Sequence, residues 1–555
     1  MSINLVKKCS TCLLLFYKPQ LFFIKIKNML ERISKEFFID KNTLRMIRHN
    51  RDVWKGWAPQ ESEKIIITEF HNLAIINVPT FYFLNVLGKK KGARIVSFGR
   101  SHRRLARAIH HLYRSWNVSG HISTSNLSPA QKARRDALFL AVSKDLKTKE
   151  DVFNIQIDGL NIGIDIYETY LREYNKPTVE IDKKLFVLLR WSIGVLVFWQ
   201  DYLTQHPVIA VAASHDCYVD SNVLFKVAYQ KKIPVYLPFF IKTEYAKRPF
   251  SKNSECMNYK AWFETLTEQE KKAGMAVAQE QLEKRFRGEW SADTGYMKIS
   301  AFQSTGEEKP VLRKSAKIKV LICSHCFYDN PHTYGGMIFI DFYEWLKFLS
   351  QIARKTDYDW YLKTHADPLP GTLETIEGIL GKDSPITVIA PRVTHHQLIK
   401  EGLNFVLTAY GSVGHEYPAL GVQVINAGYN PHASFDFTWT PKNITEYEKW
   451  LMDLGSLKKT IKLEEIYQFY YMHFYFCRID DLVFDSFRRL IGTLTMQQKI
   501  ASDLYDYFLK TWDPKRHQKS IERFSDFIDS GKQHLYIKGP MDELIPYVKG
   551  KGYLS

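Results

Sequence analysis

The 555-residue sequence predicts an α/β protein: two Rossmann-like domains that face each other across a cleft, followed by a helical C-terminal region. Three observations support this prediction. The length exceeds what one ordinary core accommodates, so two or three domains are expected. From residue 64, short apolar runs alternate with helix-like segments, as in βαβ units with a parallel sheet. This alternation stops in a charged stretch, 242–315, and then begins again.

The first domain is expected over residues 61–241, after a basic and apolar N-terminal segment, 1–60. Apolar runs occur at 64–70 and 73–78, and a helix-like segment follows them at 79–90. Further strands are expected at 93–99, 207–214 and 233–239, and helices at 128–147, 164–174, 182–204 and 221–232.

The second domain is expected over residues 316–440. Its strand-like runs lie at 318–324, 359–364, 386–390, 405–410 and 421–428, and helical patterns separate most of them. Residues 242–315 are interpreted as a connecting segment, and residues 441–555 as a helical, aromatic region. Open sheets of this kind bind ligands at the carboxyl ends of their strands.

The chain is strongly basic, with a formal charge of +18 and a pI near 9.2, which indicates an anionic partner. Nucleic acid is the least favoured, because no nucleic-acid-binding motif accompanies the charge. The hydrophobic content of 45% excludes a disordered chain. The number of cysteines is odd and their spacing shows no disulfide framework, so a reduced cytosolic setting is expected.

The N-terminal segment has no apolar run long enough to span a bilayer, because lysines and a proline interrupt it. Residues 1–50 contain ten Lys/Arg against three Asp/Glu, a net of +7. A basic, aromatic segment of this kind suits the inner face of a membrane, and an amphipathic helix packed on the protein is the equal alternative.

Polar side chains follow four successive strands of the second domain. The stretch "FVLTAYGSVGHEYPALGVQVINAG" (405–428) places Gly411, Ser412, Gly414 and Glu416 between two apolar runs. The glycines allow a tight turn and a close ligand, and the hydroxyl with nearby amides suits a phosphate. Glu416 can accept hydrogen bonds from a ribose diol. A plain strand–helix turn with a Ser cap is the alternative.

The segments "LKTHADP" (362–368) and 411–428, with the histidine-rich loop after residue 324, resemble capsule and surface polysaccharide glycosyltransferases. These are GT-B enzymes akin to bacterial Kdo transferases and polysialyltransferases. The resemblance implies that Lys363, His365, Ser412 and Glu416, with His325, hold a nucleotide-sugar co-substrate. It implies no resident cofactor or metal. The family's turn is a direct His-Pro, whereas here two residues separate His365 from Pro368.

The resemblance also implies that the first domain faces the acceptor, a glycan or a lipid-linked molecule on the cytoplasmic side of the membrane. Arg100 and Arg103 are candidate clamps for an anionic acceptor, and a solvated basic helix is the alternative. His215 and Asp216 end a strand and are the first candidates for the general base. Glu168 is a rival base and acceptor ligand, although it can instead pair with Arg172 at i, i+4.

Other functions require residues that can be compared with this sequence. A serine hydrolase elbow fails because position 410 is Tyr, and a P-loop fails because Gly381-Lys382 lacks its flanking residues. A metal enzyme built from His325, Asp329, His332 and His365 is conceivable. A sugar-nucleotide epimerase of the same architecture, which needs no acceptor, and a non-catalytic polysaccharide-assembly protein remain open.

Overall fold

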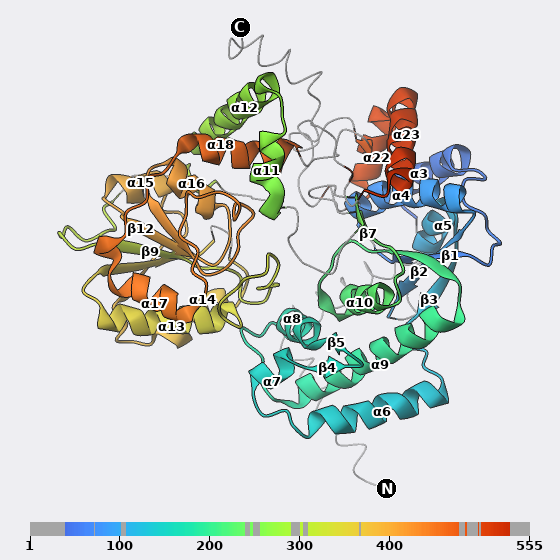
Figure 1. Cartoon of the computed structure of the whole chain (residues 1–555), viewed down its shortest axis with the longest axis horizontal. Coiled ribbons are helices and arrows are strands. Elements are labelled where there is room, and N and C mark those ends of the chain that lie inside the picture. Colours follow the sequence, from blue (N-terminus) through green and yellow to red (C-terminus); the bar gives the residue numbers. More distant parts are fainter. Residues whose placement is uncertain are drawn as a thin grey trace, which may run out of the picture.

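The computed structural model describes residues 39–71, 73–100, 107–238, 245–247, 256–289, 300–303, 309–365, 368–476, 483–484, 498, 501–532 and 535. Within these ranges it confirms two Rossmann-like α/β domains and a helical C-terminal region (Figure 1). Residues 1–38 of the expected membrane-facing segment, 1–50, lie outside the described residues.

The first domain is built on a six-stranded sheet of order β3-β2-β1-β6-β7-β8. The pairs are parallel except for β7 with β8. The strands are β1 (Ile65–Glu69), β2 (Arg94–Gly99), β3 (Val118–Ser123), β6 (Val208–Ala212), β7 (Val235–Pro238) and β8 (Tyr245–Lys247).

Alternating side chains of this sheet enter two separate cores, as a sheet covered on both faces requires. Ile66 of β1 packs into one core, and its neighbours Ile65 and Ile67 pack into the other. The first core lies under α3 (Lys41–Val53), α4 (Ala74–Lys91) and α5 (Arg107–Ser115). The second lies under α8 (Gly163–Tyr174), α9 (Lys183–Gln205) and α10 (Val223–Gln230), with α6 (Pro129–Ser143) against α9 and α7 (Lys149–Phe153) against α8.

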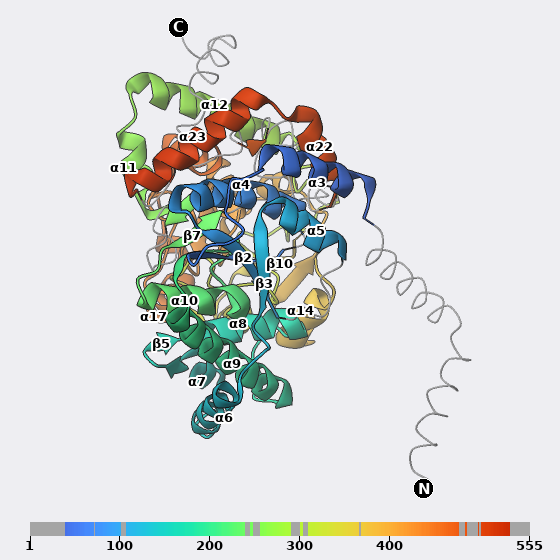
Figure 2. The ribbon, with the colours of Figure 1, turned by 90° about the vertical axis from the view of Figure 1, so that its right-hand side faces the viewer.

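The C-terminal helices return to the first domain. Helix α22 (Asp503–Thr511) packs on α3, and α23 (Pro514–Ser530) packs on α4. Both views show these red helices beside the blue ones (Figures 1 and 2). Residues from the far end of the chain, such as Phe508 and Phe524, therefore complete the core that the first residues begin.

The second domain has a fully parallel five-stranded sheet of order β11-β10-β9-β12-β13. The strands are β9 (Lys319–Cys323), β10 (Asp359–Lys363), β11 (Ile386–Ile389), β12 (Phe405–Thr408) and β13 (Gln423–Asn426). Helices α13 (Phe342–Lys355), α14 (Thr372–Leu380) and α17 (Ile444–Met452) cover one face, and α15 (His395–Lys400) and α16 (Val413–Ala419) the other.

A helical cluster sits on the second domain beside α16. It consists of α11 (Tyr259–Glu264), α12 (Glu268–Phe286) and α18 (Leu463–Tyr471), which share an apolar core. Helix α12 begins at a Thr267–Glu270 capping box. Residues from the expected connecting segment thus reach the candidate site, because α12 ends next to α16.

Several elements differ from the sequence prediction, among them the short hairpin of β4 (Gln156–Ile157) with β5 (Leu160–Asn161), and β8 inside the expected connecting segment. The apolar run 73–78 is not a strand, and its residues from Ala74 begin α4, a helix buried nearly all round, which removes the amphipathic period that identifies helices. Strand β3 was not predicted, because its middle residues Ser119, Gly120 and His121 are polar or small. Helix α9 is long and apolar enough to cross a membrane, but 61% of its apolar window is buried inside the domain.

Candidate functional site

Each sheet has a point where the strand order reverses. In the second domain it lies between β9 and β12, and in the first domain between β1 and β6. The loops that follow these strands diverge and leave a crevice for a ligand. The loops after β9 and β12 carry His325 and the stretch 411–414, and the loop after β6 carries His215 and Asp216.

His325 follows β9 and joins the two loops of the second switch point. Its Nε2 accepts the backbone N–H of Tyr410 at 3.3 Å and lies 3.0 Å from the Thr408 hydroxyl. The ring stacks on Phe342. Burial lowers the pKa of His325 to about 3, and the nearby His365 adds to this. His325 is therefore a neutral ring whose Nε2 is already in use.

A buried charged cluster lies beside this loop. Arg285 of α12 donates from Nε to Oε1 of Glu416 at 2.9 Å, and their side chains are 2% and 1% exposed. Lys363 ends β10 and is also buried. Among the described residues its Nζ has no hydrogen-bond or ion-pair partner. Burial lowers the pKa of Lys363, and the nearby charge of Arg285 lowers it further. Cys323 and Glu416 act in the opposite direction and raise it.

The cluster contains two cationic side chains, Arg285 and Lys363, and one carboxylate, Glu416, so one positive charge is not neutralised. His395 lies next to it and bonds to the hydroxyl of Tyr417 through Nδ1 at 2.5 Å. Burial, together with the charges of Lys363 and Arg285, holds the pKa of His395 well below its usual value. The Glu416 Oε2 atom is buried and has no partner among the described residues. A buried group with excess positive charge suits an anionic ligand such as a phosphate.

The loop from Gly411 to Gly414 differs in detail from the sequence interpretation. The amide of Gly411 donates to Asn430 and that of Gly414 to the carbonyl of Gly411, so neither is available to a ligand. A Cβ on Gly414 would lie 2.5 Å from the His432 ring, so this glycine admits a protein side chain. Gly411 has φ +147°, which does require glycine. Ser412 leaves its hydroxyl without a capping bond.

The alternative metal site of the second domain does not assemble. His325 is tied to Thr408 and Tyr410, and His365 is exposed. Asp329 pairs with Arg172 at 2.9 Å, and His332 with Glu168 at 3.2 Å. Three of the four expected ligands therefore serve other partners, and the fourth is exposed.

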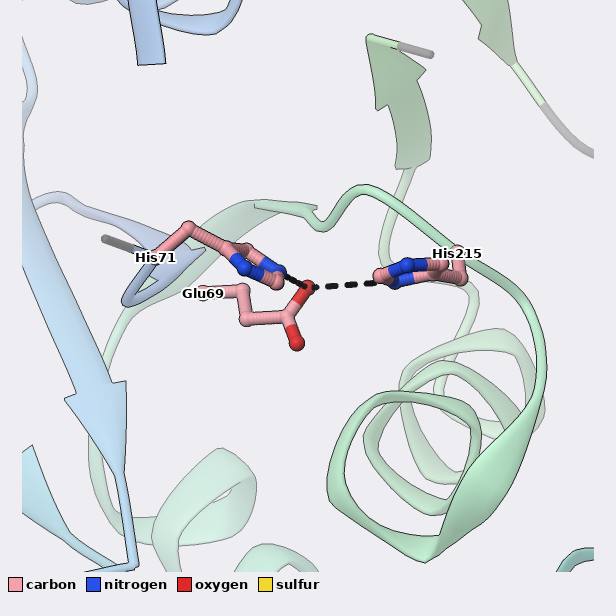
Figure 3. A group of neighbouring side chains, drawn as sticks. All are labelled: Glu69, His71 and His215. Carbon is pink, nitrogen blue, oxygen red and sulfur yellow. Dashed lines mark ion pairs between the residues drawn. The ribbon is translucent and has the colours of Figure 1, made fainter. Parts of the chain in front are cut away.

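A compact cluster occupies the switch point of the first domain. Glu69 ends β1, His71 follows it, and His215 follows β6 (Figure 3). Ser214 directly precedes His215. The Glu69 Oε2 atom lies 3.0 Å from His71 Nε2, 3.1 Å from the Ser214 amide and 4.0 Å from His215 Nδ1. Burial raises the pKa of Glu69, but His71, His215 and these hydrogen bonds together lower it to about 2.

The histidines lie on either side of the Glu69 carboxylate, and the ligand atoms of the three residues lie within 4.8 Å of one another (Figure 3). Two imidazoles and a carboxylate are a zinc-type donor set. The point between them is taken by the Ser214 hydroxyl, 2.6 Å from His215 Nδ1 and 2.8 Å from His71 Nε2. Hydrogen bonds therefore account for the arrangement without a cation.

The acceptor candidates are placed differently from expectation. Arg100 is held by Asp220, at 2.8 Å, and by Glu173, and it stacks on Trp191, so its charge is already neutralised. Arg103 lies outside the described residues. Glu168 is fully buried and bonds to His332, rather than to Arg172 one turn along its helix. Asp216 lies beside His215, and its charge acts to raise the pKa of His215.

The two switch points are connected. Tyr218, three residues after His215, donates its hydroxyl proton to Asp329 at 2.7 Å, and Asp329 lies four residues after His325. Arg172 joins the same carboxylate at 2.9 Å. The loop that carries the candidate base therefore touches the loop of the candidate nucleotide site.

Sequence reasoning missed Arg285, Glu69, His71 and Ser214. Arg285 lies in the expected connecting segment, 242–315, where no sequence motif indicates a functional residue. Glu69 and His71 lie at the end of the expected strand 64–70. The rule that ligands bind at the carboxyl ends of strands also applies to the first domain and identifies both residues.

No protein-family model matches the chain, and no curated protein matches it. Solved structures are similar in part. KpsC of Thermosulfurimonas dismutans, a beta-Kdo 2,4-transferase, is 13% identical over 47% of this chain and 79% of its own, with a TM-score of 0.28. The UDP-GlcNAc 2-epimerase of Neisseria meningitidis is 10% identical over 73% and 97%, with a TM-score of 0.21. MurG of Acinetobacter baumannii is 11% identical over 83% and 99%, with a TM-score of 0.20. Similarities at this level assign no function to this chain.

Proposed function

We propose that this chain is a glycosyltransferase of the GT-B type. It moves a sugar from a nucleotide-activated donor to a growing surface polysaccharide or a lipid-linked acceptor. The observation that carries the proposal is the contact between the two switch-point loops, Tyr218 to Asp329. Through this contact the loop of a histidine base in the first domain touches the loop after β9 of the second, whose sheet also carries the cationic cluster.

The donor would bind the second domain. The leaving nucleotide phosphate gains negative charge as its bond to the anomeric carbon breaks, and fixed positive groups stabilise that charge. Lys363, whose ammonium has no described partner, is the first candidate. The Ser412 hydroxyl on the loop after β12 and the exposed His365 are the others. Glu416 is held by Arg285, and its second oxygen is the atom left to receive a ribose hydroxyl.

The acceptor would bind the first domain. Its hydroxyl oxygen forms the new bond to the anomeric carbon, and its proton passes to His215. Burial lowers the pKa of His215 although Glu69 raises it, so the ring is neutral at neutral pH and able to accept that proton. We also propose that the basic N-terminal segment before α3 attaches the protein to the inner face of the membrane, where lipid-linked acceptors are found.

The test uses two buried lysines at opposite ends of the same sheet. Lys363 is the last residue of β10. Lys319 is the first residue of the neighbouring strand β9, at the opposite end of the strands, and donates to the Ser315 carbonyl. UDP-, CMP- and GDP-sugars are screened for thermal stabilisation, which reaches about 2.7 kcal/mol at a hundredfold excess over Kd. Lys363→Met should abolish the stabilisation and lower transfer about a hundredfold. Lys319→Met should keep both.

Three outcomes contradict the proposal. The first is that no nucleotide sugar stabilises the wild-type protein. The second is that Lys363→Met and Lys319→Met behave alike. The third is that mass spectrometry shows the donor sugar converted without any acceptor, which would indicate an epimerase.

A further inference from the structure

Ser214 is the centre of the cluster in the first domain. Its Oγ lies 2.6 Å from His215 Nδ1, 2.8 Å from His71 Nε2 and 3.0 Å from Glu69 Oε2. A serine hydroxyl has one proton to donate and two lone pairs that accept. It can therefore satisfy all three neighbours only if it donates to one and accepts from the other two.

The position of each proton follows from Glu69. This carboxylate is ionised, so its Oε2 accepts and never donates. Three atoms surround Oε2 at hydrogen-bond distance: the Ser214 amide at 3.1 Å, His71 Nε2 at 3.0 Å and the Ser214 hydroxyl at 3.0 Å. Each of them must bring a proton, because two bare acceptors at 3.0 Å repel. The Ser214 hydroxyl therefore donates to Glu69.

His215 is then left with one arrangement. Since the hydroxyl proton already points at Glu69, the 2.6 Å contact needs the proton of His215 Nδ1. A neutral imidazole has one N–H, so its Nε2 is the bare nitrogen. His215 is also the most exposed of the four, at 34% of its side chain against 18% for His71 and 13% for Glu69. Only this ring can meet a substrate readily.

We propose that Ser214, held by Glu69, is a positioning residue that fixes His215 in the Nδ1–H tautomer and so presents Nε2 as the base for the acceptor hydroxyl. The assignment of the base rests on the proposed glycosyltransferase function. His71 keeps the Glu69 carboxylate oriented from the other side. Ser214 is not a nucleophile, because it is buried and because His71 uses the same nitrogen towards Ser214 and Glu69, which allows no relay through the ring.

The tautomer can be measured without any turnover. The full chain is labelled with ¹⁵N-histidine, and the His215 signals are identified by their loss in His215→Gln. Wild type should show a protonated Nδ1 and a bare Nε2. Ser214→Ala should lose this preference. The matched control is Ser221→Ala, which removes a hydroxyl bonded to the other oxygen of the same carboxylate, at 3.0 Å, and should keep it.

The pH profile of transfer tests the catalytic part. The imidazolium cannot accept a proton, so kcat/KM should fall as the pH drops through the pKa of His215. Glu69 and Asp216 raise that pKa, and His71 and Arg172 lower it. Glu69→Gln removes a raising charge, so the acidic limb should move to lower pH. Ser214→Ala should reduce kcat by about tenfold to a hundredfold, which is no more than the usual contribution of the general base that it positions.

Several results would overturn the proposal. A protonated Nε2 in wild type would do so, as would an unchanged tautomer in Ser214→Ala or equal effects of Ser214→Ala and Ser221→Ala. Stoichiometric zinc or manganese in the purified protein, lost on His71→Ala, would also overturn it, because a cation between these ligands displaces the hydroxyl. If the tautomer is as expected but no sugar is transferred, the proposed function fails and the tautomer assignment stands.

Discussion

At the scale of single residues, the buried pair of Arg285 and Glu416 combines two roles. The two charges are withdrawn from water, and their attraction offsets that cost only while both are present. Lys363 adds a second cation with no described partner. The same cluster therefore holds α12 against α16 and leaves excess positive charge for a ligand.

We expect Arg285→Met to lower the free energy of unfolding by about 3–5 kcal/mol, because it leaves Glu416 buried without its partner. Adding Glu416→Gln removes the orphaned charge and should recover part of that loss. Urea unfolding of both single variants and the double variant gives the coupling between the two sites. Strictly additive losses would show that the pair does not interact.

At the scale of elements, the short helix α16 is fixed by close packing on both sides. Gly414 lies against the His432 ring, and Tyr417 bonds to His395. The sequence interpretation assigned Gly414 to ligand approach, whereas the structure assigns it to helix packing. The loop that remains accessible is shorter, and it centres on Ser412.

Gly414→Ala should therefore destabilise the protein by about 1–3 kcal/mol, because its Cβ meets the buried His432 at 2.5 Å. Gly378→Ala is the matched control, since Gly378 lies in α14 of the same domain with no atom within 4 Å of its added Cβ. That change should stabilise the helix by up to about 1 kcal/mol. Equal thermal unfolding temperatures for the two variants would contradict the packing role.

At the scale of the whole molecule, the two domains are joined by polar contacts as well as by the chain. Tyr167 and Thr178 both donate to Asp341, which caps α13. Lys149 pairs with Glu344 at 2.6 Å. These contacts fix the first domain against the start of α13, next to the loop that carries Asp329.

The net charge of +18 predicts salt-dependent binding to anionic membranes. Full-length protein should sediment with vesicles that contain phosphatidylserine at low salt and be released at high salt. A variant that starts at residue 39 retains every described element and should sediment less. Equal sedimentation of the two forms would show that the N-terminal segment does not mediate attachment.

Much of the fold could be predicted from the sequence because buried parallel strands are continuous apolar runs. All five strands of the second domain lie within their expected ranges. Strand β3 escaped because its polar residues resemble a loop, and the start of α4 escaped because a helix buried all round has no apolar stripe. The strand-end rule names His215, Lys363 and Ser412 as candidates, and their role stays a prediction.

The sequence by itself determined the two α/β domains and the types of side chain at their strand ends, since the alternation of apolar and helical segments places the strands along the chain. Tertiary structure alone decided the partners of those side chains. Arg285 reaches Glu416 across 131 positions, and Ser214 reaches Glu69 across 145. Such pairs depend on helix packing and strand order, which local patterns do not encode. Arg100 shows the converse, because carboxylates far along the chain neutralise a charge that the sequence left free.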